Sequence, residues 1–291
     1  MQTARKPVKG ADKLLSDLVA LDYLTIAQAV KVGEYKATSL PYLRKTFWEL
    51  IAAGLVATLP RQLKTQPVVY TPTTTGYRYA AALGLTWPQR IRPVDEREKA
   101  KNRLFLQHTL AISDVLIAAK LLAKTQPAIE LSSLYTERSL KRKIAVPLAD
   151  TRTHYIEPDA SLEFLLMETV HDTPQTWQDF FHIEVYRHLP LEGRFKQKVS
   201  GYVTAVDTGI HAALFNTEAL SIAVFCETVQ QTSLLKRWTE DALTEMGRVE
   251  EGERFFFRSG HVATATPSEL FLSPDWQQAF GETTTPLLVL E

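Results

Sequence analysis

The sequence predicts a two-domain protein of the α/β (α+β) class: a small helical domain that ends in a β-hairpin, then a mixed sheet flanked by helices. Its 291 residues are enough for two domains that each bury a core. Apolar residues recur first with a helical period and later with alternating strand and helix periods. Residues 1–92 hold 13 Lys and Arg against 5 Asp and Glu, a net charge of +8, and the remainder holds 20 against 28, a net of −8.

The first 85 residues predict three helices, a hairpin and a fourth helix. Helices are expected over 11–21, from a Thr25–Gln28 capping box to Gly33, and from Ser39 to Gly54. Strand-like runs at 55–59 and 68–71 are joined by the polar segment 60–67, and a helix follows at 75–83. This order is typical of a winged helix-turn-helix, which we place at about 8–85.

The third predicted helix carries a face suited to double-stranded DNA. Opposite its apolar stripe (Leu40, Leu43, Phe47, Leu50 and Ile51) lie Pro41, Lys45, Trp48 and Ala52, with Arg44 on the flank. A basic helix fits the major groove, and basic residues of the hairpin can hold phosphates. The predicted DNA-binding residues are Tyr42, Arg44, Lys45, Trp48, Arg61 and Lys64. The alternative is a winged helix used for protein contacts, with Trp48 as the interface anchor.

Residues 86–101 combine two prolines with dense mixed charge, which predicts a linker, and the second domain then covers 102–291. It should begin with a long helix at 102–125, which could pair two chains in a homodimer. Its other expected elements are strands near 129–135, 161–167, 180–187, 220–227 and 253–258, and helices at 192–207 and 232–247. This alternation favours a mixed sheet flanked by helices.

Two carboxylates in the second domain could carry chemistry. Asp159 precedes the strand at 161–167, and Glu184 lies inside the apolar strand at 180–187, where a carboxylate is costly unless it is paired or bound to metal. PD-(D/E)XK nucleases hold Mg²⁺ with two such acids on adjacent strands. Their lysine, two residues after the second acid, is Tyr186 here, so Lys196 or Lys198 on the following helix would have to replace it.

The candidate catalytic residues are therefore Asp159, Glu184, Lys196 and Lys198, with Asp159 and Glu184 as candidate Mg²⁺ ligands; without an active site of this kind no cofactor is expected. The alternative makes Asp159 a turn residue and Glu184 the ion-pair partner of Arg187, Arg194 or Lys198.

Other classes of function lose support. The single cysteine, Cys226, excludes an intramolecular disulfide and a cysteine zinc site, and the seven histidines lack metal-ligand spacing. No P-loop, dinucleotide-binding or hydrolase-elbow motif occurs. The N-terminus has no signal-peptide pattern and no apolar run approaches the ~20 residues of a membrane span, so a cytoplasmic protein without membrane contact is expected.

Taken together, these segments resemble the replication-relaxation protein family of bacterial plasmids and mobile elements. The resemblance covers about residues 11–230. It rests on the winged-helix pattern, Gln107-His-Thr-Leu-Ala-Ile-Ser-Asp114, Pro158-Asp-Ala160, Ile183-Glu-Val-Tyr-Arg187 and the helix Gly193–Tyr202. It implies a DNA-binding protein acting in plasmid replication and DNA relaxation, with a restriction-endonuclease-like second domain.

Tyr186 departs from the family, in which an acidic residue is common at this position. This departure and the net charge of −8 favour a scaffold that recruits replication or transposition proteins to a DNA site. The alternatives are a metal-dependent nicking nuclease and a winged-helix transcriptional regulator or protein-interaction adaptor.

Overall fold

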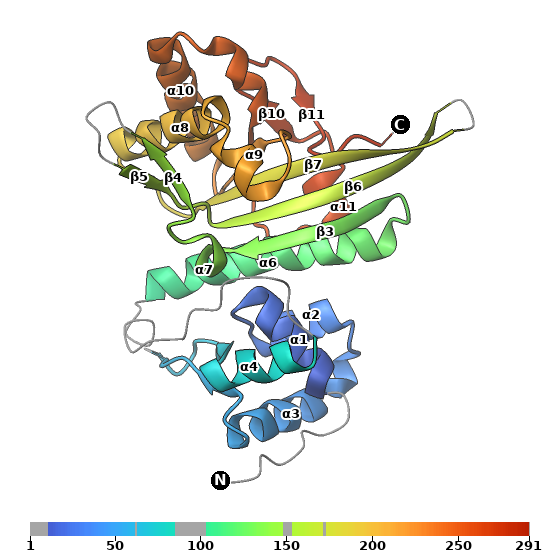
Figure 1. Ribbon diagram of the computed structural model, residues 1–291. Coiled ribbons are helices and arrows are strands. Elements are labelled where there is room, and N and C mark those ends of the chain that lie inside the picture. The colour runs from blue at the N-terminus through green and yellow to red at the C-terminus, as the bar shows by residue number, and fades with distance from the viewer. Residues whose placement is uncertain (1–10, 62, 85–102, 148–152, 171–172, 291) are drawn as a thin grey trace. The chain divides into compact units, whose positions relative to one another are not determined.

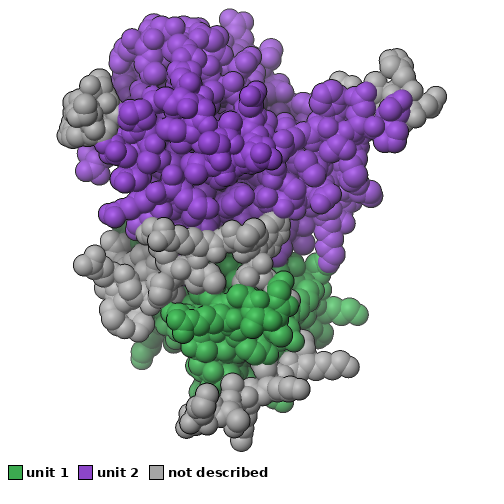
Figure 2. Space-filling model, viewed as in Figure 1, with its two compact units in different colours: residues 1–117 green, residues 118–291 purple. Residues whose placement is uncertain are grey.

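The computed structural model describes residues 11–61, 63–84, 103–147, 153–170 and 173–290. The chain forms two compact units, residues 1–117 and 118–291, coloured separately in Figure 2. The predicted linker at 86–101 lies outside the described residues. The division between the units falls inside the long helix α6 (Arg103–Thr125), so the first part of this helix belongs to the first unit.

The first unit contains the helices and the hairpin expected from the sequence. Its elements are α1 (Ala11–Leu21), α2 (Ile26–Gly33), α3 (Leu40–Ala52), β1 (Val56–Thr58), β2 (Tyr70–Pro72) and α4 (Thr74–Ala82), as Figure 1 shows. The capping box forms: Gln28 N donates to Thr25 Oγ1 at 3.2 Å, and Thr25 N donates to Gln28 Oε1 at 3.0 Å. Strands β1 and β2 pair antiparallel.

Helix α3 packs one side into the core of this unit. Leu43, Phe47 and Leu50 are fully buried, and the Phe47 ring stacks on Tyr70 of β2 with centroids 3.8 Å apart. Leu40 and Ile51, expected in the same stripe, are only half-buried.

The start of α4 lies against Leu55, the residue before β1, at Gly76. A Cβ there would lie 2.0 Å from the Leu55 carbonyl oxygen. Only glycine allows this close approach of the two backbones, so Gly76 fixes how the second strand of the hairpin leads into α4.

The second unit is built on a seven-stranded mixed sheet of order β11-β10-β9-β8-β7-β6-β3. Strand β6 pairs antiparallel with β3 and with β7, and β8 pairs parallel with β7 and with β9. Strand β10 pairs antiparallel with β9 and with β11. The strands are β3 (Ile129–Thr136), β6 (Ala160–Val170), β7 (Thr173–Tyr186), β8 (Ser221–Cys226), β9 (Phe255–Ser259), β10 (Trp276–Gln278) and β11 (Thr284–Thr285).

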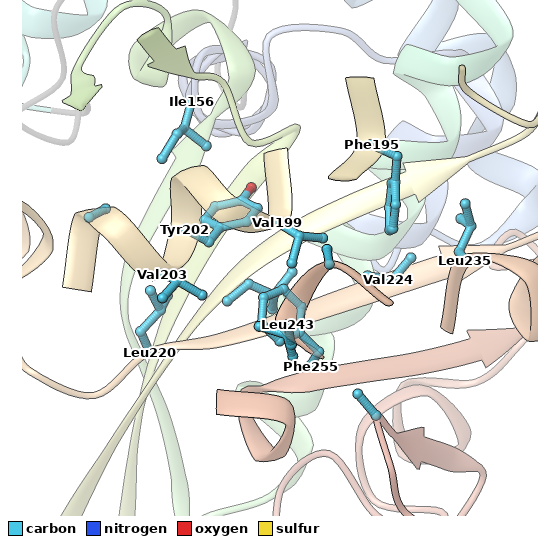
Figure 3. Close-up of a cluster of buried hydrophobic side chains, with 14 of the residues drawn as sticks. Ile156, Phe195, Val199, Tyr202, Val203, Leu220, Val224, Leu235, Leu243 and Phe255 are labelled. Carbon is cyan, nitrogen blue, oxygen red and sulfur yellow. The ribbon is translucent and has the colours of Figure 1, made fainter. Parts of the chain in front are cut away.

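Helices α8 (Glu192–Asp207), α9 (Ile210–Phe215) and α10 (Val229–Met246) lie on the same face of this sheet, with the small hairpin β4 (Ile144–Pro147) and β5 (Thr153–Ile156) beside α8. Figure 3 shows Val199 and Tyr202 of α8, Val224 of β8 and Leu243 of α10 meeting in the core.

On the opposite face, Phe271 of α11 (Pro267–Phe271) packs on Phe164 with ring centroids 5.6 Å apart. A further short helix, α7 (Glu137–Leu140), follows β3.

The apolar periodicity of the sequence predicted most of these elements. Helix α8 has the expected bounds, and the five expected strands are present. Strand β6 continues to Val170 and β7 begins at Thr173, so both are longer than the expected 161–167 and 180–187. The sequence did not predict these extensions because most of their residues are polar and exposed and lack the apolar alternation of a half-buried strand. Strands β4, β5, β10 and β11 span two to four residues each, too few to carry a period.

Among the residues that the structure describes, one helix, Leu104–Thr125, is long and apolar enough by length and composition to cross a membrane, contrary to the expectation that no segment approaches this length. Half of its most apolar window is buried inside the protein, which is also the property of a core helix in a soluble protein.

Candidate functional site

The exposed side of α3 gathers the residues predicted to bind DNA. Pro41, Arg44, Lys45, Trp48 and Ala52 are all exposed, and we call these five residues the α3 face. The Lys45 side chain is 73% exposed, and its Nζ lies 4.0 Å from Glu49 Oε1, at the limit of an ion pair. A pair this open and long contributes little, so the ammonium can turn to another anion. The α3 face therefore presents two cations beside an indole ring.

The hairpin residues Arg61 and Lys64 are also exposed. Burial raises the pKa of Tyr70, whereas the positive charges of Arg44 and Arg61 lower it. Because both charges act on the same phenol, Arg44 of α3 and Arg61 of the hairpin both lie in the neighbourhood of Tyr70. Tyr42 is 39% exposed, and its ring lies 6.5 Å from that of Tyr35.

In the second unit, strand pairing brings the two predicted acids together. Ala160 of β6 pairs with Ile183 of β7, so Asp159 lies next to Glu184 across the hairpin. Asp159 N donates to the Ile183 carbonyl at 3.0 Å, and Val185 N donates to Asp159 Oδ2 at 2.7 Å. Asp159 is thus bound to the backbone of β7.

Glu184 is 2% exposed and is held by two side chains from α8. Lys198 Nζ lies 2.5 Å from the Glu184 carboxylate, and the Tyr202 hydroxyl donates to Oε1. Lys198 and Tyr202 share one face of α8 because they are four residues apart. Among the partners considered from the sequence, Glu184 therefore has Lys198, whereas Arg187 pairs with Glu227 at 2.6 Å.

Lys196, the other candidate lysine, points elsewhere. Its Nζ lies 3.2 Å from Glu192, 3.7 Å from Asp241 and 3.0 Å from Glu245, the last two on α10. Two residues along a helix rotate a side chain by roughly 200°, so Lys196 and Lys198 cannot both face β7. The structure brings together Asp159, Glu184 and Lys198, and leaves Lys196 out.

Burial dominates the electrostatics of this cluster. It raises the pKa of Glu184 to about 7, with Asp159 acting in the same direction and Lys198 and Tyr202 opposing it. Burial would lower the pKa of Lys198, but the charges of Glu184 and Asp159 more than offset this, and the pKa is raised. Burial and the negative charge of Glu184 also raise the pKa values of Tyr186 and Tyr202. The tyrosines thus remain neutral and Lys198 remains charged.

Two polar residues next to this cluster were not predicted. Ser161 Oγ lies 2.6 Å from His182 Nδ1, and the His182 ring stacks on Tyr202 with centroids 5.4 Å apart. Burial lowers the pKa of His182 well below its usual value, so the imidazole is neutral. The sequence could have indicated that His182 lies beside Glu184, because His182, Glu184 and Tyr186 are alternate residues of one strand and alternate residues share one face.

The cluster does not fit a Mg²⁺ site as it stands. Asp159 accepts a hydrogen bond from the β7 backbone, and the Glu184 carboxylate is engaged by Lys198 and Tyr202. Within the described ranges, no group of three or more His, Cys, Asp or Glu side chains is placed to hold a metal ion. A carboxyl with a raised pKa is also a poor ligand, because metal binding requires the ionised form. Lys198 supplies the positive charge beside Glu184.

Comparisons with protein-family models, curated proteins and solved structures found no significant match to this chain.

Proposed function

We propose that this chain binds double-stranded DNA through its first unit, with the α3 face in the major groove and the hairpin on the phosphates. The observation that carries the proposal is the α3 face itself. Arg44, Lys45 and Trp48 are exposed on a helix whose other side is held in the core by Phe47. A rigid helix with a cationic outer face has the dimensions and charge that the major groove accepts.

Three further features support this role. The order α1, α2, α3, β1, β2 is that of a winged helix, in which the third helix reads the groove. The segment between β1 and β2 carries Arg61 and Lys64, both exposed, where a wing would meet the backbone. Residues 1–92 carry a net charge of +8, which favours any polyanion.

For the second unit we infer a nuclease-like fold used as a scaffold. Helix α6, strands β3, β6 and β7, helix α8 and strand β8 occur along the chain in the order of a PD-(D/E)XK core, with α7, β4 and β5 inserted between β3 and β6 and α9 between α8 and β8. Asp159 and Glu184 lie at the corresponding strands. The Glu184–Lys198 ion pair takes the place of a metal site. Together with the resemblance to the replication-relaxation family, this supports a role at a DNA site of a plasmid or mobile element, where the second unit would engage partner proteins.

The DNA-binding proposal is tested by reversing charge on the two DNA-facing elements. Lys45→Glu combined with Lys64→Glu should weaken binding to a labelled duplex about tenfold or more, because two phosphate contacts become repulsive. Fluorescence anisotropy at fixed salt measures the effect. Lys141→Glu with Arg142→Glu makes the same change of charge at exposed positions of the second unit and should leave affinity nearly unchanged. Equal losses in both pairs would refute the proposed interface.

A second candidate, a metal-dependent nuclease, is favoured by one observation: Lys198 reaches Glu184 beside Asp159, which assembles two acids and a lysine. Supercoiled plasmid incubated with the protein and Mg²⁺ or Mn²⁺ distinguishes the two functions. The scaffold proposal expects the plasmid to stay supercoiled with wild type, Asp159→Asn and Glu184→Gln alike. Nicking by wild type that both substitutions abolish would establish the nuclease instead.

A further inference from the structure

Trp48 is the most exposed large apolar side chain among the described residues, with 75% of its surface accessible. It lies on the α3 face between charged neighbours, one turn after Arg44 and Lys45 and one turn before Ala52. A partner that covers this indole would remove its apolar surface from water, which favours binding. The partner must offer apolar surface next to negative charge.

A second copy of this chain is a poor occupant. Two α3 faces brought together would set Arg44 and Lys45 of one copy against the same residues of the other. Like charges placed across an interface oppose association. The cations that flank Trp48 therefore favour an anionic partner.

Duplex DNA has one apolar feature that an indole in the major groove can reach. The faces of the bases are covered by stacking, and hydrogen-bonding groups dominate the major-groove edges of the bases. Thymine adds its 5-methyl group. Phosphates border the groove on both sides, within reach of flanking cations. The chemistry around Trp48 matches this arrangement.

We propose that Trp48 packs against thymine 5-methyl groups in the major groove and makes α3 selective for thymine at the contacted positions. This inference rests on the proposed DNA binding and adds a determinant of sequence preference to it. Arg44 and Lys45 contact the bordering phosphates and hold the ring over the base edges. Ala52, one turn further on the same face, extends the apolar track.

Replacing thymine with uracil tests the contact, because uracil pairs identically and lacks only the methyl group. The full chain first selects its preferred duplex from a randomised pool, and each thymine of that duplex is then replaced by deoxyuridine. We expect wild-type affinity to fall about fourfold for each contacted methyl. Trp48→Ala should bind the thymine and uracil duplexes equally, and Trp48→Phe should retain part of the discrimination. Trp177→Ala removes another exposed indole, from strand β7, and should discriminate as wild type does.

The outcomes separate this inference from the proposed function. Duplex binding that is insensitive to uracil in the wild type refutes the Trp48 contact and leaves DNA binding intact. The same refutation follows if Trp48→Ala keeps the wild-type discrimination, or if that variant changes the oligomeric state instead. Absence of duplex binding by the wild type refutes the proposed function itself.

Discussion

Replacing Lys198 with methionine should lower the free energy of unfolding of the second unit by about 3 kcal/mol at about pH 9, where Glu184 is ionised in the folded wild type because its pKa is about 7. The substitution keeps the length and apolar stem of the side chain but removes the charge that lies 2.5 Å from Glu184. Glu184 is 2% exposed, so its carboxylate cannot recover water as a partner. Urea unfolding followed by tryptophan fluorescence measures the loss, since Trp238 and Trp276 are buried in this unit.

Two variants control this result. Lys196→Met removes a lysine from the same helix, but its partners Glu192 and Glu245 are exposed, so the loss should stay below about 1 kcal/mol. Lys198→Met combined with Glu184→Gln removes both charges and should recover most of the stability. If Lys198→Met and Lys196→Met are equally mild, the Glu184–Lys198 pair does not stabilise the unit.

Glu184→Gln should change how stability depends on pH. The pKa of Glu184 is raised by burial from 4.5 to about 7 in the folded protein. A pKa that is raised in the folded state contributes to the free energy of unfolding fully below pH 4.5, and this contribution is lost as the pH rises through about 7. The reason is that the carboxyl of the unfolded chain loses its proton at a lower pH than that of the folded chain. Between pH 4.5 and about pH 7, the free energy of unfolding of the wild type should fall by about 3 kcal/mol relative to that of Glu184→Gln.

The measurement is the difference in unfolding free energy between the two proteins at intervals from pH 4 to pH 8. Taking the difference cancels the carboxyl groups that both proteins share. The raised pKa of Lys198 adds nothing in this window, since Lys198 stays protonated throughout it. A constant difference across the range would show that folding leaves the pKa of Glu184 unchanged, and a gain for the wild type with rising pH would show that folding lowers it; either result contradicts the raised pKa.

Much of the fold followed from local pattern. Helix caps and apolar periodicity depend on residues that are close in sequence. The sequence therefore predicted the Thr25–Gln28 capping box, the helix at 192–207 and the strands around Asp159 and Glu184. The proximity of the two acids followed from the hairpin, since antiparallel neighbours face each other.

The choice of partner for Glu184 depends on tertiary structure. Three basic residues near it in sequence were equally plausible, and the rotation of α8 over the sheet brought Lys198 and Tyr202 to it while turning Lys196 toward α10. The contact between Ser161 and His182 was missed because each residue lies in an otherwise apolar strand segment. Periodicity gives the face of a strand, but not which helix covers it.

Salt dependence of duplex binding is the most direct test of the claim that the first unit binds DNA. Counterion release makes the logarithm of the affinity fall linearly with the logarithm of salt concentration, with a slope of about −0.9 for each phosphate contacted. We expect a steep negative slope for the full chain. Neutralising Arg44, Lys45, Arg61 and Lys64 together should make that slope shallower by between about 3 and 4. An affinity that does not change with salt, or a variant with the wild-type slope, would contradict the account.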